Sequence, residues 1–282
     1  MSKEIIIGSR GSDLALWQAN FVKDELAKHN IQTRIEIIKT QGDKIQDLSF
    51  DKLEGKGFFT KEIEEKLLDK SIDIAVHSYK DLETTPPKGL SIGAVSYRED
   101  PSELIIIRKE SYDNNKKFRF KQNAIIGTSS NRRKSQLLSF RPDITINDLR
   151  GNVPTRIQKL REGNYDAIIL AKAGVNRLEI DLSEFETITL NPNEFIPAPA
   201  QGILGLQIRE NDSDTAKIVE LLNNEAIYAI SSFCEYKKNK AILNAGKIKP
   251  TSGTRIEGKN AAAIIYLLIF ILKLIIYIIN YI

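Results

Sequence analysis

Short runs rich in β-branched residues alternate with amphipathic helical stretches, and this alternation limits the possible folds of the chain more than any other feature. Predicted strands at residues 5–9, 33–40 and 72–78 are separated by predicted helices at residues 13–30 and 59–70. A βαβ rhythm of this kind indicates a parallel sheet, because parallel neighbours need a long crossover connection. The predicted fold class is therefore α/β.

The same rhythm starts again further along the chain. Apolar runs at Leu90–Val95 and Glu103–Arg108 continue the first pattern, and the Lys- and Asn-rich residues 111–122 are predicted to form a surface loop. A second series of strands and helices occupies residues 124–174. Residues 197–208 are apolar and Pro-rich, which suits a strand that crosses back to complete the first unit.

Two similar α/β lobes with a cleft between them are the simplest arrangement of these elements. The chain has 282 residues, enough for more than one core. The predicted boundaries are residues 1–97 with 196–213 for the first lobe and residues 98–195 for the second. Ligands in such folds bind at the carboxyl ends of strands, near helix N-termini.

Charge and cysteine content exclude several classes of protein. The net charge of +4 arises from 41 basic and 37 acidic residues, so no nucleic-acid partner is expected. A single cysteine excludes an intramolecular disulfide and a multi-cysteine metal site, and no metal is predicted. The start MSKEIIIGSR lacks the apolar core of a signal peptide, so a cytoplasmic location is expected.

Arginines stand close to hydroxyl or backbone donors at three predicted strand-to-helix turns. The segments are IGSRGSDLALWQA, GTSSNRRKSQ and DLRGNVPTRIQKL, and their arginines are Arg10, Arg132, Arg133, Arg150 and Arg156. Helix N-termini favour anions and guanidinium groups bind carboxylates through paired hydrogen bonds, so carboxylates are the expected ligands. At any one turn, helix capping or a local ion pair is the alternative. The sequence has no Walker-type phosphate cradle.

A cluster of ionisable residues follows the predicted strand at residues 72–78. Asp81 is the catalytic candidate, because a carboxylate at a strand end in an arginine-lined cleft can hold a developing cation or move a proton. The alternative for Asp81 is a turn cap, and His77 is interpreted as a packed core histidine. Lys56 and Phe59 lie in a Gly-containing loop that could close over a ligand, although an ordinary surface loop has the same composition.

Eight motifs between residues 8 and 206 occur in the order typical of one enzyme family. They are IGSRGSDLALWQA, the Gly-Asp pair at residues 42 and 43, GKGFFTKEIE, DIAVHSYKDL, GTSSNRRKSQL, LRGNVPTRIQKL, LAKAGVNRL and PAQGILGL. In these motifs the chain resembles the porphobilinogen deaminases. The resemblance implies two periplasmic-binding-protein-like lobes with a central cleft, and a small third α/β domain carrying a covalently attached dipyrromethane cofactor.

The resemblance also implies an activity. Enzymes of this family are hydroxymethylbilane synthases, transferases that deaminate four porphobilinogen molecules and join them head to tail into hydroxymethylbilane during porphyrin and heme biosynthesis. Each pyrrole carries an acetate and a propionate, so a growing chain needs several cationic partners. A cytoplasmic monomer acting on this small molecule is expected.

Site roles follow from the resemblance motif by motif. Asp81 matches the catalytic aspartate, which would assist loss of ammonia and stabilise a positively charged azafulvene-like intermediate. The residues that correspond to cofactor- and substrate-binding positions are Arg10, Ser12, Lys80, Thr128, Ser129, Arg132, Arg133, Arg150, Gly151, Asn152 and Arg156. Lys56 and Phe59 belong to the active-site loop.

The last quarter of the chain departs from the family. There, a Gly-Gly-Cys followed by proline attaches the cofactor, whereas NAGKIKP places Lys247 at the expected position, and an amine cannot form the thioether. The only cysteine, Cys234, lies earlier; it is either an attachment site or a small buried thiol without a role. Residues 214–260 are therefore predicted to be an incomplete remnant of the third domain.

Residues 261–282 form an apolar tail with a single charge, Lys273. The tail is long enough to span a bilayer, but a lysine near its middle opposes insertion. Its Ile, Tyr, Asn, Lys, Phe and Leu are what A/T-rich DNA encodes in a wrong frame, so a frameshift past residue 220 is the preferred interpretation, and no membrane partner is expected.

Two alternatives to an active enzyme remain at this point. The first is an inactive relic that lacks the attachment cysteine and only binds pyrrole carboxylates. The second is a solute-binding protein held to a membrane by the tail, which would need an export signal.

Overall fold

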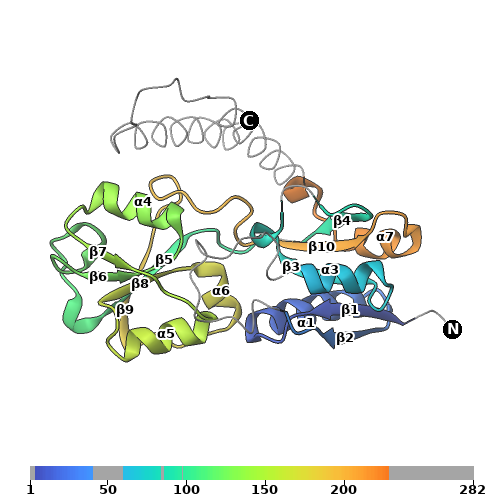
Figure 1. Cartoon of the computed structure of the whole chain (residues 1–282), viewed down its shortest axis with the longest axis horizontal. Helices are drawn as coiled ribbons and strands as arrows, with labels where there is room; N and C mark the ends of the chain where they lie inside the picture. Colours follow the sequence, from blue (N-terminus) through green and yellow to red (C-terminus); the bar gives the residue numbers. More distant parts are fainter. Residues whose placement is uncertain (1–3, 41–59, 84–85, 97, 229–282) are drawn as a thin grey trace, which may run out of the picture.

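Two α/β lobes lie side by side along the long axis of the molecule (Figure 1). The computed structural model describes residues 4–40, 60–83, 86–96 and 98–228. Each lobe contains one five-stranded sheet. The prediction of an α/β fold with two lobes is confirmed.

The sheet of the first lobe has the strand order β2-β1-β3-β10-β4. Its strands are β1 (Ile5–Ser9), β2 (Thr33–Ile37), β3 (Ile74–Ser78), β4 (Leu90–Val95) and β10 (Leu204–Arg209), and its helices are α1 (Asp13–Ala27), α3 (Lys61–Leu68) and α7 (Ser213–Glu220). Strands β1, β2 and β3 are parallel, whereas β10 is antiparallel to both β3 and β4. The triple isoleucine of β1 suits a strand covered on both faces, because β-branched side chains pack well on a pleated surface.

The sheet of the second lobe has the order β7-β6-β8-β5-β9. Its strands are β5 (Glu103–Arg108), β6 (Ile125–Gly127), β7 (Thr145–Asn147), β8 (Ala167–Ala171) and β9 (Phe185–Thr189), and its helices are α4 (Asn131–Phe140), α5 (Val153–Arg161) and α6 (Lys172–Arg177). Short 3-10 turns complete the described elements: η2 (Tyr79–Asp81), η3 (Lys109–Ser111) and η4 (Lys117–Arg119).

The two sheets have the same topology. In each, three parallel strands are followed by one antiparallel strand that enters from the other lobe, β10 in the first sheet and β5 in the second. The two connections between lobes therefore run between β4 and β5 and between β9 and β10. The predicted return strand is present as β10 (Leu204–Arg209), which is shorter than the apolar run at residues 197–208.

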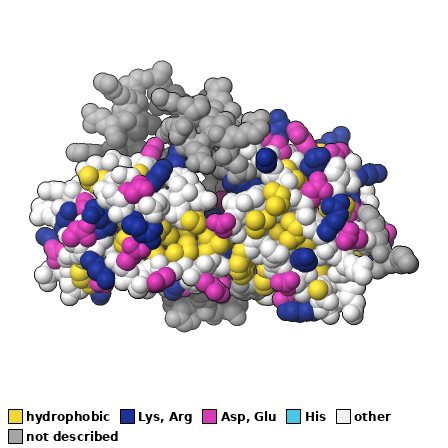
Figure 2. All heavy atoms as spheres, turned by 90° about the horizontal axis from the view of Figure 1, so that it is seen from below, with side chains coloured by type: hydrophobic (Ala, Val, Ile, Leu, Met, Phe, Trp, Pro, Cys, Tyr) yellow, Lys and Arg dark blue, Asp and Glu magenta, His cyan; other side chains and the backbone are white. Residues whose placement is uncertain are grey.

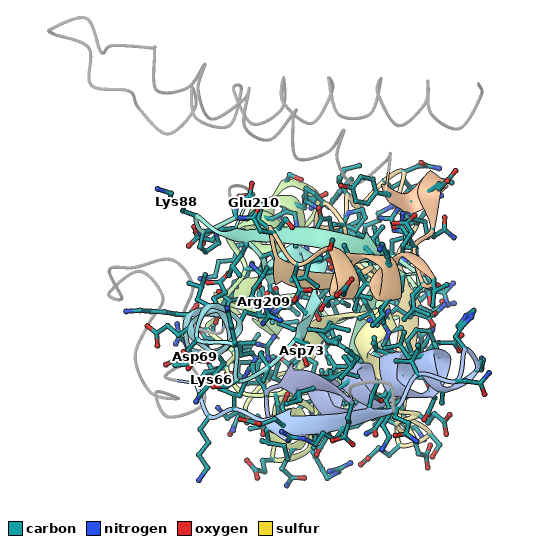
Figure 3. All side chains as sticks on the ribbon, turned by 90° about the vertical axis from the view of Figure 1, so that its right-hand side faces the viewer. Lys66, Asp69, Asp73, Lys88, Arg209 and Glu210 are labelled. Atoms are coloured by element: carbon teal, nitrogen blue, oxygen red, sulfur yellow. The ribbon has the colours of Figure 1, made fainter. Side chains whose placement is uncertain are left out.

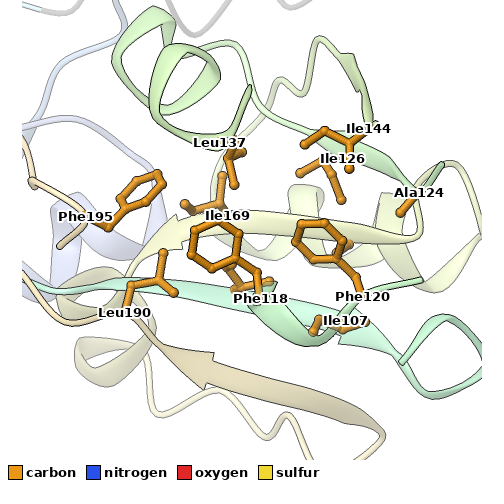
Figure 4. Close-up of a cluster of buried hydrophobic side chains, with 12 residues drawn as sticks. Ile107, Phe118, Phe120, Ala124, Ile126, Leu137, Ile144, Ile169, Leu190 and Phe195 are labelled. Carbon is orange, nitrogen blue, oxygen red and sulfur yellow. The ribbon is translucent and has the colours of Figure 1, made fainter. Parts of the chain in front are cut away.

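Part of the predicted surface loop at residues 111–122 belongs to the core of the second lobe. Phe118 is 8% exposed and Phe120 is fully buried, and both pack in a cluster with Leu137, Ile169 and Phe195 (Figure 4). The Phe118 ring meets the Phe195 ring edge to face, with 6.0 Å between centroids. The prediction was wrong here because lysine and asparagine dominate the composition, while two aromatic side chains decide the packing.

Arg209, the last residue of β10, binds this strand to the rest of the first lobe. The Arg209 guanidinium donates to the Leu67 carbonyl (3.1 Å), to the Ile72 carbonyl (2.6 Å) and to carboxylate oxygens of Asp73 (3.0 Å) and Asp212 (2.5 Å). Figure 3 shows Arg209 close to Asp73 at this end of the lobe. Because one planar group satisfies four acceptors, the returning strand is fixed in register.

Helix α7 packs on β4 and β10, with Val219 fully buried in the first-lobe core. Residues 213–222 thus lie with the first lobe, whereas the predicted boundary assigned residue 214 onward to a third domain. The other predicted boundaries stay predictions, and residues 229–260 and the apolar tail lie outside the described residues. No helix in the described part of the chain is long and apolar enough to cross a membrane.

The backbone conformation at residue 202, in the returning connection, requires a glycine. Its φ is +89°, and an added Cβ would lie 2.3 Å from the Glu99 carbonyl oxygen. We expect Gly202→Ala to lower the free energy of unfolding by about 3 kcal/mol or more in urea titration. In the control, Gly163→Ala, φ is also positive (+83°) but the new Cβ meets the end of the flexible Arg108 side chain at 3.0 Å, so about 1 kcal/mol is expected. Equal losses would contradict the role given to the Glu99 carbonyl.

Candidate active site

A cavity of about 430 Å³ lies between the lobes. The first lobe contributes Arg10, Ser12, Leu14, Gln18, Ser78, Lys80 and Asp81; the second contributes Arg133, Arg150, Gly151, Asn152, Val153, Arg156, Leu170, Ala171, Ala173, Gly174 and Arg177; the returning connection contributes Gly202 and Ile203. The residues of the two lobes lie at or after the ends of β1, β3, β6, β7 and β8, or in the helices that follow, whereas Gly202 and Ile203 directly precede β10. The predicted central cleft at carboxyl strand ends is therefore present.

The lining of this cavity is strongly cationic. Among the described residues that line it, five arginines and Lys80 accompany a single carboxylate, that of Asp81. Acidic and basic side chains are interspersed on the face of the molecule in Figure 2, so the charge of the cavity lining differs from that of this face. Such a cavity favours a ligand with several carboxylates.

Desolvation shapes the charges within the cavity. Burial lowers the pKa of Lys80, and nearby Arg133 and Arg132 act in the same direction, while Asp81 and Glu103 oppose the shift. Burial, with a contribution from Arg133, lowers the pKa of Arg156 to about 10, so this guanidinium stays charged at neutral pH. Asp81 acts on both cations, which places its charge among them although its side chain is exposed.

The α5 end of the cavity is built by a capped helix N-terminus. The Asn152 side chain accepts from the Thr155 backbone N–H (2.9 Å), and Gly151 has a φ of +111° that favours glycine. Arg156 donates through Nε to the Gly151 carbonyl (2.7 Å), which fixes the root of its guanidinium at the cavity. The order Gly-Asn-Val-Pro thus positions Arg150 and Arg156 on the same side of the site.

Three predicted binding residues are placed outside the cavity lining. Thr128 is 2% exposed, and Ser129 exchanges hydrogen bonds of 3.1 Å with the backbone of Leu149. Arg132 donates to the Ile196 carbonyl (2.6 Å) and to the Glu103 carboxylate (2.5 Å). These contacts are structural, so a direct binding role for the three residues stays a prediction.

Glu103 is a buried carboxylate between two arginines. Its side chain is fully buried, one oxygen accepts from Arg132 and the other accepts from Arg133 at 2.7 Å. Burial alone would raise the pKa of Glu103, but the two guanidinium groups outweigh it and hold the pKa below its usual value. Glu103 thereby fixes Arg133 at the cavity and directs Arg132 away from it. Sequence reasoning missed this residue because it directly precedes the apolar run Leu104–Ile107 of β5.

Other functional candidates were also missed from the sequence. Ser78 and Gln18 line the cavity and are joined by a 2.8 Å hydrogen bond between their side chains, and Arg177 lines it from α6. Their motifs, WQA, AVHSYK and GVNRL, are in the sequence, but only the fold brings them together. Lys56, Phe59, Cys234 and Lys247 lie outside the described residues. Among those described, no cluster of His, Cys, Asp or Glu could hold a metal ion.

His77 is a core residue, as predicted. It is 6% exposed, and its Nε2 lies 3.0 Å from the Gln207 side-chain oxygen; Gln207 in turn donates to Glu64 (3.0 Å). Burial, opposed by the Gln207 hydrogen bond and assisted by Arg10, lowers the pKa of His77 from 6.5 to about 4. The imidazole is therefore neutral at neutral pH.

This shift predicts an acid-sensitive fold. In the unfolded chain His77 binds a proton as the pH falls below 6.5, whereas in the folded chain it binds one only near pH 4. The free energy of unfolding therefore decreases as the pH falls from 6.5 to about 4. Between pH 7 and pH 5 the contribution is about 2 kcal/mol. His77→Gln keeps a donor for Gln207. In this variant the free energy of unfolding, measured by urea titration, should decrease less between pH 7 and pH 5 than in the wild type. Exposed His29→Gln is the control; a loss unchanged in His77→Gln would refute the assignment.

Comparison with known proteins assigns the family. Residues 5–217 match the family model described as "Porphobilinogen deaminase, dipyromethane cofactor binding domain". The chain is 42% identical over 262 residues to the porphobilinogen deaminase of Chloroherpeton thalassium, covering 91% of this chain and 80% of that protein. It is 46% identical over 229 residues to the porphobilinogen deaminase of Chlorobaculum parvum, covering 80% and 71%. A solved periplasmic substrate-binding protein from Coxiella burnetii is similar with a TM-score of 0.46 at 14% identity, over 83% of this chain and 97% of that one. From the match to the family model and the identity to these relatives, the chain belongs to the porphobilinogen deaminase family.

Proposed function

We propose that the chain is a hydroxymethylbilane synthase, a transferase that deaminates porphobilinogen and joins four molecules of it head to tail in tetrapyrrole biosynthesis. The observation that carries the proposal is the cavity between the lobes, in which five arginines and one lysine accompany one carboxylate. A growing chain of pyrroles with acetate and propionate groups has the complementary charge. The sequence relatives named above carry the same activity in their names.

The chemistry of the lining fits the dipyrromethane cofactor named by the family model. We assign its carboxylates to the cations around the cavity, with Arg133, Arg150 and Arg156 of the second lobe and Arg10 of the first as the main partners. When bound, the cofactor supplies the pyrrole carbon to which the first porphobilinogen is joined. Cys234, the only candidate for its attachment, and Lys247, at the position expected for the attachment cysteine, lie outside the described residues.

Other residues of the cavity lining bind the substrate and balance the positive charge that develops on it. Asp81 is the group able to balance a positive charge on the pyrrole that loses ammonia, because it is the only carboxylate among the described residues lining the cavity. Lys80, with its pKa lowered by burial, and Ser12 serve as donors to substrate carboxylates.

We further propose a monomer that acts in the cytoplasm on this small molecule and binds no nucleic acid. The mild net charge of +4, and the interspersed acidic and basic side chains on the face in Figure 2, support the absence of a nucleic-acid partner.

The test is incubation of the purified full chain with porphobilinogen, with intact-mass spectrometry on the same preparation. The proposal expects a covalent dipyrromethane on the chain, a colour reaction with Ehrlich's reagent, and release of one ammonia per porphobilinogen consumed. A chain that carries no adduct and consumes no porphobilinogen would refute it.

A further inference from the structure

The lobes touch through an aromatic ring and a guanidinium group. Arg177, at the end of α6 in the second lobe, lies over the Trp17 ring of α1 in the first lobe, with 5.4 Å between its Cζ and the ring centroid. Arg177 is 5% exposed and lines the cavity. The contact therefore joins the interface between the lobes to the wall of the site.

The same guanidinium is held a second time from the returning connection. Its Nη2 donates to the Gly202 carbonyl at 2.6 Å, and Gly202 lies two residues before β10. The helices α1 and α6 lie close together here: a Cβ added at Gly174 would lie 3.5 Å from Leu14 Cδ2. A cation of one lobe is thus oriented by groups attached to the other lobe.

Trp17 is itself rigidly placed. Its ring stacks on Phe21, one turn along α1, with centroids 5.6 Å apart and an angle of 8° between planes. The opposite face of α1 carries Ala19, Val22 and Leu26, all fully buried in the first-lobe core. A guanidinium binds well to an aromatic face because it is planar and weakly hydrated. The core of the first lobe therefore determines where the Arg177 cation lies.

We propose that Trp17 is a positioning residue for the pyrrole-binding site. Its ring holds Arg177 at the cavity wall in the orientation that receives a carboxylate. Because Trp17 and Arg177 belong to different lobes, this contact exists only in the arrangement of the lobes seen in the structure. Trp17 has no contact with the ligand in this assignment; it acts through Arg177. The inference rests on the proposed function for the identity of the ligand, but its geometric part does not.

The kinetic test compares three variants with porphobilinogen as substrate. Trp17→Leu is expected to raise KM about tenfold, the size of a desolvated cation–π contact, with kcat within about twofold of the wild type. Trp17→Phe keeps a weaker aromatic face and should raise KM less. Phe140→Leu removes an exposed ring of α4 outside the cavity lining and should leave KM unchanged. Equal KM values for Trp17→Leu and Phe140→Leu, in chains with native circular dichroism, would overturn the proposal.

A second readout needs no activity. Trp17 is the only tryptophan of the chain, so tryptophan fluorescence reports on this position alone. Arg177→Met should change the emission of the ligand-free protein, whereas Arg161→Met, at an exposed arginine paired with Glu184, should not. Identical emission from Arg177→Met and the wild type would overturn the positioning role. An emission change in Arg177→Met, together with a wild-type chain that consumes no porphobilinogen, would instead refute the proposed function and leave the contact standing.

Discussion

Asp81→Asn is expected to lower kcat for porphobilinogen consumption by about 10²–10⁴-fold, the range typical of a lost acid–base or charge-stabilising group. The substitution keeps the size of the side chain and removes its negative charge from a cavity whose other ionised lining groups are cations. Asp81 lies exposed in the 3-10 turn η2, so the free energy of unfolding should stay within about 0.5 kcal/mol of the wild type. Rates with excess porphobilinogen and urea titrations measure the two quantities.

Glu83→Gln is the matched control for Asp81. Glu83 is two residues further along the same segment and does not belong to the cavity lining, so its neutralisation should leave kcat nearly unchanged. A similar fall of kcat in both variants would mean that the net charge of the segment matters, rather than the Asp81 carboxylate. A kcat that survives in Asp81→Asn would remove Asp81 from the mechanism.

The second large effect is expected on stability, from the buried Glu103. Glu103→Gln leaves Arg132 and Arg133 without their shared counter-charge, and breaking a buried pair in this way costs about 3–5 kcal/mol. Because the pKa of Glu103 is held below its usual value, its contribution is complete above the unfolded pKa and is lost as the pH falls through the folded one. The difference in unfolding free energy between wild type and variant should therefore be full at pH 7 and shrink below about pH 4.

The control for Glu103 is an exposed pair of the same lobe. Glu110 pairs with Arg108 at the surface, and Glu110→Gln should cost less than about 1 kcal/mol. Chemical unfolding of both variants at pH 7 and pH 4 distinguishes the two situations. Equal costs at pH 7 would show that burial of Glu103 between the arginines does not carry the energy assigned to it.

Glu103 also matters for the arrangement of the site. Glu103 directs two adjacent arginines to different tasks: Arg133 lines the cavity, whereas Arg132 ties α4 to the Ile196 carbonyl. From the sequence both have the same pattern, an arginine in the first turn of a helix. Neighbouring helix positions point about 100° apart, so their environments differ even though their sequence context is the same.

Local patterns sufficed for the lobes and for the cationic character of the cavity. Strand and helix periods depend on neighbouring residues, so β1 and α1 were predicted within a few residues, and the return strand followed from an apolar, Pro-rich run. The ordered motifs also placed Arg10, Lys80, Asp81, Arg150 and Arg156 together, and the cavity contains all of them.

Long-range contacts decided the rest. Gln18 meets Ser78 across 60 positions, and Arg177 is oriented by Trp17 from the other lobe. Phe118 and Phe120 enter a core from a stretch that is otherwise polar. The sequence by itself determined the α/β rhythm, the two units and the cationic character of the site, because these depend on residue types and short spacings. Only the tertiary structure decided which cations line the cavity and what holds each of them, because that depends on burial and on partners far away in the chain.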